Sequence, residues 1–499
     1  MTDAMAGAMT QAPHTLVLPR AELDAAVAQA WPLAEVGAGA GAAATLIAHG
    51  PLALHSAWGD TVALVGPLRT GGFRREQGAV RQTRGVALLA CAPAGDRPPA
   101  GPAEWEAWLG RHASGFRLAA HTANPVLAVL WLRPDGVAAA ACRMPPGPDR
   151  GGAQWHPITG LRLPGAGMHL IHLPATWHTG VPGRATPQAA LPAPEADADA
   201  EDGSGPAAPG RYSRQAAALG DDVLARLQAS RIAVVGTGRI GSAVAHSLAR
   251  MGASLLLLDP DVMEDHNLDG DLPPLHEGRP KVQAAARYLR GLVRPGAVVD
   301  ARVLPIASPA AGALLAGADV VLCCVDNDAA RLWANAWALA LLKPFVDMAT
   351  GVHAHGAEAD LRCLPPGTGC LACVGGFAQG GQLLQQLQSA QPPATPADVR
   401  QQRRGSLRSW GQISAHLGLR LLEQLYAGQL DRALHRRVSE TPDGGLQVRD
   451  FSPPRPGLAP ASTGTCPVCA ALQGAGLAAV QPEGLQAVAR AMLDAGAGR

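Results

Sequence analysis

Residues 231–268 constrain the fold of this chain more than any other segment. Their apolar run at 232–235 predicts a buried parallel strand, and a second run at 255–258 predicts another. Between the two runs, a glycine-rich turn at 236–241 leads directly into an amphipathic helix. A strand, a glycine turn, a helix and a second strand form the βαβ unit of a doubly wound α/β sheet. We therefore expect a Rossmann-like domain in this part of the chain.

The same segment carries residue types that suit a bound nucleotide. Gly236, Gly238 and Gly241 let the backbone pass close to phosphate groups, and the following helix offers free N–H groups and the positive end of its dipole. Asp259 ends the second strand, where a carboxylate can accept a hydrogen bond from a ribose hydroxyl. A glycine turn alone is a weak signal, but the strands, helix and acid around it strengthen it. We predict a nucleotide site at this turn.

Composition limits the classes of protein to which the chain can belong. Its 499 residues are enough for two or three domains, and 47% of them are hydrophobic, which indicates globular domains. The formal net charge of +1 argues against a nucleic-acid or membrane-surface partner. No apolar run reaches the roughly 20 residues needed to cross a bilayer, and no secretory signal is evident at the N-terminus. We expect a cytoplasmic protein.

Shifts in composition divide the chain into five segments. We expect a flexible tail at residues 1–13 and a mixed α/β domain over 14–182. Residues 183–210 are rich in Pro, Ala and acidic side chains with almost no large apolar ones, which is typical of a linker. The nucleotide-binding domain is expected over 211–476, and one more helix over 477–499.

The 14–182 segment has no nucleotide fingerprint. Its periodicity predicts helices over 20–31 and 104–112 and strands over 44–48, 61–65, 86–91, 126–132 and 168–173. His169, His172 and His178 cluster in the sequence, but this segment lacks the His-x-His motif of the zinc isopeptidases that accompany ubiquitin-like systems. We interpret the segment as a docking or recognition domain, and a degenerate relative of that isopeptidase fold is one version of this interpretation.

Four of the nine cysteines form two Cys-x-x-Cys pairs, Cys370 with Cys373 and Cys466 with Cys469. Two short chelating pairs from distant segments commonly build a closed, tetrahedral four-thiolate zinc site, which leaves no position open for catalysis. A redox-active dithiol is the alternative, but two pairs without a thioredoxin-like context disfavour it. We expect a structural Zn²⁺ site in a reducing compartment.

The rest of the 211–476 segment continues the alternation of strands and helices. An apolar strand over 319–325 ends in Asp326 and Asn327, at the kind of strand end where doubly wound sheets bind ligands. Further elements are predicted as helices over 222–228, 330–341 and 407–426 and from Lys281 onward, and as strands over 343–347 and 356–363.

Several motifs occur in one order along this half of the chain. They are Arg-Tyr-Ser-Arg-Gln at 211–215, the glycine turn, Asp-x-Asp-Val with a later Asn-Leu, Lys281 after Gly-Arg-Pro, Asp-Asn-x-x-x-Arg from Asp326, and the two cysteine pairs. Over residues 211–469 this order resembles the adenylating domain of ubiquitin-activating enzymes and of their bacterial relatives in molybdopterin, thiamine and microcin biosynthesis. The resemblance implies an adenylyltransferase that uses ATP and Mg²⁺ to activate the C-terminal carboxylate of a small protein or peptide, with release of pyrophosphate.

The resemblance also implies roles for individual residues. Lys281 would contact the phosphates of ATP, and Arg214 would reach across a homodimer interface into the other subunit's site. Asp326 would organise Mg²⁺, and Asp259 would bind the ribose. The nucleotide pocket would also include Asp261, Asn267 and Asn327. These residue types suit the reaction, because a carboxylate that attacks a phosphate needs cations to hold the two anions together.

One position departs from the family pattern. An Arg that touches the phosphates usually stands two residues after Asn-Leu, whereas this chain has Gly270 there. Arg279, close to Lys281, is a candidate to replace the missing cation. Reduced adenylation activity is the alternative outcome.

The chain also lacks the nucleophilic cysteine with which many activating enzymes form a thioester. No Cys occurs in residues 374–465, which include a Gln-, Ala- and Arg-rich crossover loop at about 376–405. Cys323, Cys324 and Cys363 fall in predicted strands, so we expect them to pack in a core. The chemistry then stops at the acyl-adenylate, or a thiol of a separate conjugating enzyme takes the acyl group.

The sequence thus predicts a zinc-stabilised homodimer that activates a ubiquitin-like protein with a C-terminal Gly in a bacterial conjugation pathway. Activation of a sulfur carrier or of a peptide for modification is one alternative. A catalytically weakened nucleotide-binding scaffold is another, motivated by Gly270 and the absent loop cysteine. An NAD-dependent dehydrogenase would share the glycine turn but would explain neither the cysteine pairs nor residues 211–215.

Overall fold

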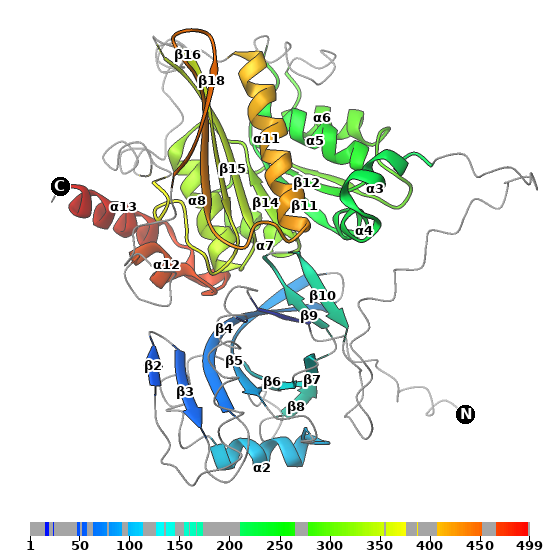
Figure 1. Cartoon of the computed structure of the whole chain (residues 1–499), viewed down its shortest axis with the longest axis vertical. Coiled ribbons are helices and arrows are strands. Elements are labelled where there is room, and N and C mark those ends of the chain that lie inside the picture. The colour runs from blue at the N-terminus through cyan, green and yellow to red at the C-terminus, as the bar shows by residue number, and fades with distance from the viewer. Residues whose placement is uncertain are drawn as a thin grey trace, which may run out of the picture. The chain divides into compact units, whose positions relative to one another are not determined.

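The chain forms two compact units, the first made mainly of residues 22–163 and the second mainly of residues 192–499. Figure 1 shows the elements of both units in the computed structural model. The residues that the structure describes are 15–18, 23, 47–49, 52–56, 63–76, 79–91, 98–112, 126–133, 136–144, 154–158, 160–165, 167–172, 210–264, 278–353, 356–375, 387, 407–451 and 466–497. The predicted linker at 183–210 lies, apart from Gly210, outside these residues.

The first unit is built on a ten-stranded sheet. Its main path has the order β10-β9-β1-β4-β5-β6-β7-β8, and β2 and β3 pair beside β4. β4 and β5 form an antiparallel hairpin, whereas β5 and β6 are parallel, with helix α2 (Pro102–His112) between them along the chain. The strands are β1 (Thr15–Val17), β2 (Ile47–His49), β3 (Leu52–Ser56), β4 (Ala63–Glu76), β5 (Ala79–Cys91), β6 (Val126–Arg133), β7 (Gly136–Met144), β8 (Gln154–Pro157), β9 (Gly160–Leu163) and β10 (His169–His172).

Tryptophan side chains fasten α2 to this sheet. Trp105 of α2 is buried and stacks on Trp155 of β8, with ring centroids 5.6 Å apart. Trp108, also buried on α2, meets Trp131 of β6 edge-on at 5.8 Å. Aromatic pairs in these geometries contribute about 0.5–1.5 kcal/mol beyond the area that they bury. The helix predicted over 104–112 is therefore part of a packed core.

The predicted strands of the first unit are confirmed where the structure describes them, as parts of β2, β4, β5, β6 and β10. The helix predicted over 20–31 lies, apart from Leu23, outside the described residues. β7 was not predicted, because its run of alanines favours a helix and only pairing with β6 makes it a strand. His169 and His172 stand at the two ends of β10, and His178 lies outside the described residues.

The second unit is built on an eight-stranded sheet in the order β13-β12-β11-β14-β15-β16-β17-β18. β13, β12, β11, β14 and β15 are parallel, which confirms the doubly wound pattern for one half of the sheet. β16, β17 and β18 continue the sheet as an antiparallel meander. The strands are β11 (Arg231–Val235), β12 (Ser254–Leu258), β13 (Val299–Arg302), β14 (Val320–Cys323), β15 (Phe345–His353), β16 (Gly356–Leu364), β17 (Leu434–Glu440) and β18 (Leu446–Phe451).

Helices cover both faces of this sheet. α11 lies across one face, against β15 and β16 and beside α5, whereas α8 packs on the opposite face (Figure 1). α11 approaches closely, because a Cβ on its Gly418 would lie 2.1 Å from the sulfur of Met348 on β15. The helices are α3 (Ser213–Leu219), α4 (Asp221–Ala229), α5 (Arg239–Met251), α6 (Lys281–Leu289), α7 (Pro309–Ala316), α8 (Asp328–Ala340), α11 (Arg408–Tyr426), α12 (Pro467–Leu472), the 3₁₀ turn η4 (Leu477–Ala479) and α13 (Pro482–Ala497).

The structure confirms the helices predicted over 222–228, 330–341 and 407–426 and from Lys281 onward, as α4, α8, α11 and α6. The single helix predicted over the C-terminal tail is instead η4 followed by α13. β17 and β18 were not predicted. Every residue of β18 is exposed at the sheet edge, and its apolar alternation at Leu446 and Val448 ends at Asp450, which is too short to mark a strand.

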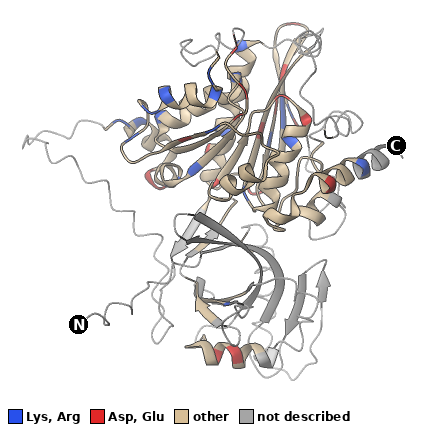
Figure 2. Ribbon diagram, turned by 180° about the vertical axis from the view of Figure 1, so that it is seen from behind, with Lys and Arg blue, Asp and Glu red and all other residues tan. Residues whose placement is uncertain are grey.

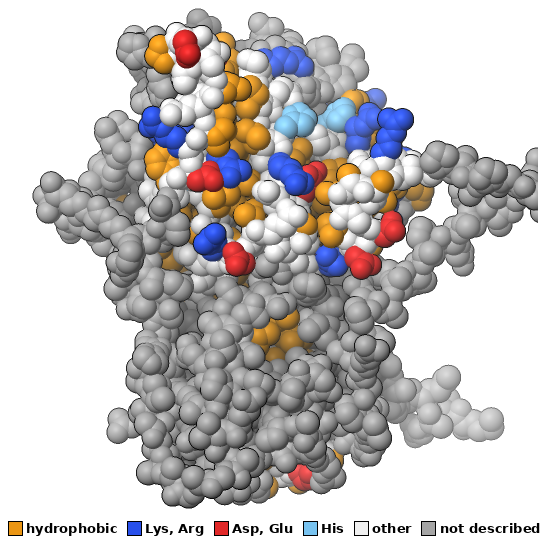
Figure 3. Space-filling view, viewed as in Figure 1, with side chains coloured by type: hydrophobic (Ala, Val, Ile, Leu, Met, Phe, Trp, Pro, Cys, Tyr) orange, Lys and Arg blue, Asp and Glu red, His pale blue; other side chains and the backbone are white. Residues whose placement is uncertain are grey.

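The surface of the second unit carries no single dominant charge on the face shown in Figure 3, where basic, acidic and apolar side chains are mixed. This mixture agrees with the net charge of +1. No helix among the described residues has both the length and the apolar character of a membrane span.

Gly312 of α7 faces the rigid ring of Trp337 on α8, and a Cβ at Gly312 would lie 2.7 Å from that ring. Gly312→Ala is expected to lower the free energy of unfolding by about 1–3 kcal/mol, because overpacking must displace the ring. Gly484 of α13 is the control, since a Cβ there meets nothing within 4 Å. Gly484→Ala should raise the stability by up to about 1 kcal/mol. Urea denaturation followed by circular dichroism measures both, and equal effects of the two substitutions would contradict this packing.

Candidate functional site

The glycine turn between β11 and α5 has a backbone that only glycine can form. Gly236 has φ +86°, and a Cβ on it would lie 2.9 Å from the carbonyl oxygen of Cys324. A Cβ on Gly241 would lie 1.9 Å from the carbonyl oxygen of Gly236. Gly238 is the N-cap of α5, and a Cβ there would meet nothing within 4 Å. The turn therefore leaves open space in front of a helix N-terminus, where an anion is favoured.

Asp259 follows β12 and is bound to the glycine turn. Its Oδ2 accepts hydrogen bonds from the Thr237 backbone N–H at 2.6 Å and from the Thr237 hydroxyl at 3.1 Å, and its Oδ1 accepts one from the Asp261 N–H at 2.9 Å. Burial raises the pKa of Asp259, and the hydrogen bonds from Thr237 and Asp261 only partly offset that effect. The carboxylate is thus held in one orientation at the end of the strand.

Lys281 lies at the start of α6 and joins the same cluster. Its Nζ is 2.9 Å from Asp261 Oδ2, and its backbone N–H donates to the Asp261 carbonyl at 2.9 Å. The Lys281 side chain is 11% exposed, whereas that of Asp261 is 62% exposed. The glycine turn, Asp259, Asp261 and Lys281 therefore form one connected set of groups, with a cation held beside two carboxylates.

Asp326 and Asn327 follow β14, which is the strand next to β11 in the sheet. Both are exposed. Asn327 is the N-cap of α8, because its Oδ1 accepts a hydrogen bond from the Ala330 N–H at 2.8 Å, while its Nδ2 donates to Asp326 Oδ1 at 3.4 Å. Because its oxygen is used to cap the helix, Asn327 fixes the geometry of the turn that carries Asp326.

The remaining predicted site residues are not brought into this cluster. Arg214 is exposed on α3, and no described contact joins it to the glycine turn, to Asp259 or to Lys281. Asn267 and Gly270 lie outside the described residues. Arg279 is exposed, and its backbone carbonyl accepts a hydrogen bond from the Met263 N–H at 2.7 Å, which sets it beside the start of α6.

The two cysteine pairs meet, although about a hundred residues separate them in the sequence. The sulfur of Cys370 is 3.7 Å from the sulfurs of Cys373 and Cys466, and the sulfur of Cys373 is 3.7 Å from that of Cys469. Four sulfurs at about 2.3 Å from a central Zn²⁺ in a tetrahedron lie about 3.8 Å apart. The donor set and its spacing therefore fit a structural Zn²⁺ ion.

The other cysteines of the second unit are packing residues, as predicted. Cys323 and Cys363 are fully buried, and Cys324 is nearly so. Burial raises the pKa of Cys363 to about 12 and raises those of Cys323 and Cys324 well above the ordinary thiol value. A buried thiol with a raised pKa is a poor nucleophile.

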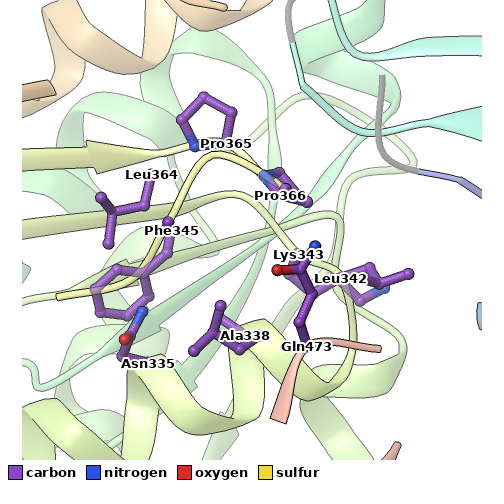
Figure 4. A pocket seen from close by; sticks show the side chains of 12 residues that line it. Asn335, Ala338, Leu342, Lys343, Phe345, Leu364, Pro365, Pro366 and Gln473 are labelled. Atoms are coloured by element: carbon purple, nitrogen blue, oxygen red, sulfur yellow. The ribbon is translucent and has the colours of Figure 1, made fainter. Parts of the chain in front are cut away.

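A small pocket is shown in Figure 4. Its lining includes Gly369, which directly precedes Cys370 in the chain, and none of the residues of the glycine turn. It is lined by α8 and by the chain that leads from β16 to the first cysteine pair, with Asn335, Phe345 and Leu364 among its residues. Asn335 Oδ1 accepts a hydrogen bond from the Leu371 N–H at 3.1 Å. The pocket therefore belongs to the packing that supports the cysteine cluster and carries none of the predicted nucleotide-binding groups.

Three side chains that position the nucleotide cluster or the cysteine cluster were not predicted to have a role from the sequence. Thr237 fixes the orientation of Asp259. A hydroxyl side chain between the first two glycines of the turn is the sequence feature that could have indicated this role. Arg331, the last residue of the Asp-Asn-x-x-x-Arg motif, donates to the Val325 carbonyl at 2.9 Å and so fixes the turn that carries Asp326. His435 of β17 binds the carbonyl of Val374, beside the first cysteine pair. No sequence signal indicated His435, because β17 itself was not predicted.

Replacing one ligand of the cysteine cluster should remove the metal. Cys373→Ser is expected to reduce the zinc content from about one ion per chain to near zero and to lower the melting temperature by about 5 °C or more, because the closed site links distant segments. Plasma mass spectrometry and thermal unfolding measure the two effects. A variant that keeps full zinc occupancy would rule out this ligand set.

Comparisons with known proteins place this geometry in context. Residues 212–475 match the model of the ThiF family. Ubiquitin-like modifier-activating enzyme 5 of Bombyx mori is 32% identical over 163 residues, 30% of this chain and 41% of that protein. SAMP-activating enzyme E1 of Haloferax volcanii is 33% identical over 130 residues, 25% of this chain and 48% of that protein. Adenylyltransferase and sulfurtransferase uba4 of Aspergillus niger is 32% identical over 177 residues, 33% of this chain and 36% of that protein.

The chain spans less than half the length of each of these relatives. Among solved structures, that of E. coli MccB with ATP aligns with a TM-score of 0.38 and 19% identity, over 51% of this chain and 73% of that one. The family match covers more than half of the present chain, from the start of α3 to beyond the end of α12, and includes the glycine turn, Asp259, Lys281 and Asp326. The chain belongs to the ThiF family.

Proposed function

We propose that this protein is an ATP-dependent adenylyltransferase that activates the C-terminal carboxylate of a small ubiquitin-like protein. The observation that carries the proposal is the connected set formed by the open glycine turn, Asp259, Asp261 and Lys281 at the ends of parallel strands. These groups suit the ribose and phosphates of a nucleotide. Two of the relatives are named activating enzymes and a third is named an adenylyltransferase, which supports the same assignment.

Different groups of the site would bind different parts of ATP. The first turn of α5 and the open space at Gly238 would receive phosphate oxygens. Asp259 keeps lone pairs for a ribose hydroxyl beside the hydrogen bonds that orient it. The Lys281 ammonium has three N–H donors, so it could contact the phosphates while it keeps its ion pair with Asp261. Alternatively, it would break that ion pair and contact the phosphates alone.

In the proposed reaction, one oxygen of the substrate carboxylate attacks the α-phosphorus of ATP. The bond between that phosphorus and its bridging oxygen breaks, and pyrophosphate leaves with the bonding electrons. Lys281 would stabilise the negative charge that accumulates on the phosphates. Mg²⁺, which Asp326 would help to hold, would supply further neutralisation of the leaving pyrophosphate. Arg214 of a second copy would add a cation, and this role requires the proposed homodimer.

The product of this step is an acyl-adenylate, and the cysteine content of the chain limits the next step. Residues 374–465 contain no Cys, and the buried thiols of Cys323, Cys324 and Cys363 are poor nucleophiles. The chemistry would therefore stop at the acyl-adenylate, or the acyl group would pass directly to the thiol of a separate conjugating enzyme. The first unit would recruit the ubiquitin-like protein or that enzyme, within a bacterial conjugation pathway.

A second candidate is activation of a sulfur carrier or of a peptide for modification. One relative is named both adenylyltransferase and sulfurtransferase, which favours this candidate as a variant of the same chemistry. A weakened nucleotide-binding scaffold is the non-enzymatic candidate, and Gly270 in place of a phosphate-binding Arg motivates it.

ATP–pyrophosphate exchange with the purified full chain tests these candidates. Exchange that requires one ubiquitin-like or sulfur-carrier protein ending in Gly would support activation and name the cargo class. ATP binding without exchange, over a panel of such carriers and peptides, would favour the scaffold. NADH-linked turnover would contradict all three.

Lys281→Met should lower carrier-dependent exchange by about 100-fold or more, because it removes a cation that stabilises the developing charge. The matched control is Lys343→Met, since Lys343 is a buried lysine that donates to the Ala316 carbonyl away from the glycine turn. This control should lower stability while the folded fraction keeps its exchange rate. Equal exchange in Lys281→Met and wild type would remove Lys281 from the mechanism.

Arg279→Ala tests whether Arg279 replaces the cation missing at Gly270. If it does, pyrophosphate exchange should fall by about tenfold or more, since one charge-assisted contact to a phosphate is lost. Arg287→Ala, in the last turn of the neighbouring helix α6, is the control for a change of net charge. Unchanged exchange in Arg279→Ala would show that the chain works without a substitute for the missing arginine.

A further inference from the structure

A row of buried charged groups crosses the second sheet on the face covered by α8. Asp347 of β15, Arg362 of β16 and His435 of β17 are direct cross-strand neighbours. Arg331 of α8 and Asp360 of β16 complete the row, and all five residues are buried. Figure 2 shows acidic and basic positions on the strands of this sheet. We call these five residues the buried charge row.

Each member of the row contacts the next. Arg331 Nε donates to Asp347 Oδ1 at 2.9 Å, and Arg362 Nη1 donates to Asp347 Oδ2 at 2.6 Å. Arg362 Nη2 donates to Asp360 Oδ2, and His435 Nε2 lies 2.7 Å from Asp360 Oδ1. Burial raises the pKa of Asp360, but the hydrogen bond from His435 and the charge of Arg362 outweigh it and lower the pKa to about 2. The row is therefore a continuous set of charge-assisted hydrogen bonds.

One end of the row holds the turn that carries Asp326. Arg331 Nη2 donates to the Val325 carbonyl at 2.9 Å, and Arg331 Nη1 donates to Asp328 Oδ1 at 3.0 Å. These two contacts lie immediately before and immediately after Asp326 and Asn327 in the chain. The position of the Arg331 guanidinium therefore sets the position of that turn.

The other end of the row holds the loop of the first cysteine pair. His435 Nδ1 lies 2.9 Å from the Val374 carbonyl oxygen, and Val374 follows Cys373 directly. The ring of Phe451 stacks on His435 with centroids 4.5 Å apart. Both ring nitrogens of His435 thus face oxygen acceptors, one in the charge row and one in the cysteine loop.

Stability alone does not account for such a row. Burying several charges carries a desolvation penalty that the pairing often fails to repay, and apolar residues of similar volume are often as stable or more stable. What a connected row of hydrogen bonds does provide is a fixed position for the groups at its two ends. Those ends are the turn with Asp326 and the loop with Cys373.

We propose that His435 is a positioning residue that couples the cysteine cluster to the Asp326 turn through the buried charge row. This inference rests on the proposed function, because it takes the Asp326 turn as the Mg²⁺–ATP turn. A shift of the cysteine loop moves His435, and the row transmits the shift to Arg331 and hence to Asp326. Loss of the His435 contacts then weakens Mg²⁺–ATP binding although His435 never touches the nucleotide.

Three substitutions at His435 separate its two contacts. In His435→Asn the amide nitrogen lies near the former Nδ1 and can still donate to Val374, whereas in His435→Gln it lies near the former Nε2 and can still donate to Asp360. His435→Leu removes both contacts. His416→Gln is the control, because His416 is exposed on α11 and binds only the Gln412 carbonyl of its own helix among the described residues.

The experiment measures the dissociation constant of ATP by calorimetry with the full chain, once with Mg²⁺ and once in Mg²⁺-free buffer that contains no chelator, along with zinc content and melting temperature. With Mg²⁺, His435→Leu should bind ATP about fivefold or more weakly than wild type, in the range of ordinary coupling between sites. His435→Asn and His435→Gln should fall between them, and His416→Gln should match wild type. Without Mg²⁺, all five proteins should bind ATP equally.

The Mg²⁺ dependence separates positioning from a structural role, since general destabilisation would weaken ATP binding in both buffers. Equal ATP affinity of His435→Leu and wild type with Mg²⁺ would overturn the coupling, as would the same weakening without Mg²⁺. Wild type that binds ATP but exchanges no pyrophosphate with any carrier would overturn the proposed function and leave the coupling measurable. Wild type that binds no ATP would overturn both.

Discussion

The candidate site depends on the parallel pairing of β11 with β14. In this register Val235 lies opposite Cys323, and the Cys324 N–H donates to the Val235 carbonyl at 2.8 Å. Both strands therefore end at the same level, so the glycine turn and the turn with Asp326 share one edge of the sheet. The chain can leave β11 at this point only because Gly236 has no Cβ, which would otherwise lie 2.9 Å from the Cys324 carbonyl oxygen.

The charged groups at this edge are held in place by neighbouring protein groups. Thr237 orients Asp259, Asp261 is paired with Lys281, and Arg331 fixes the chain on both sides of Asp326. Preorganised charges of this kind need little rearrangement when charge develops in a reaction, which is the usual basis of electrostatic catalysis. The antiparallel half of the sheet adds to this order, because it carries the buried charge row that ends at the cysteine loop.

The predictability of the elements followed their burial. The strands β11, β12, β14 and β15 and the helices α5, α6 and α8 were predictable, since buried parallel strands are apolar throughout and the helices have an apolar face. β13 and α7 were not predicted, because Asp300 and Arg302 interrupt the strand and α7 has no polar face. β17 and β18 were not predicted either, because the adjacent Arg436 and Arg437 interrupt any alternation in β17 and the alternation in β18 ends at Asp450. The residues that position the site also differ in how far the sequence predicts them. The cysteine cluster followed from its spacing, whereas the role of His435 required the pairing of β17 with β16.

The order of residues was enough to predict the βαβ unit and the two Cys-x-x-Cys pairs, because each depends on neighbours close in sequence. Folding alone established which distant groups meet. Cys370 and Cys466 are 96 positions apart, and Asp360 and His435 are 75 apart, yet each pair is in contact. Such contacts depend on strand register and on helix packing, and a change of one residue in register would turn every side chain of a strand to the opposite face.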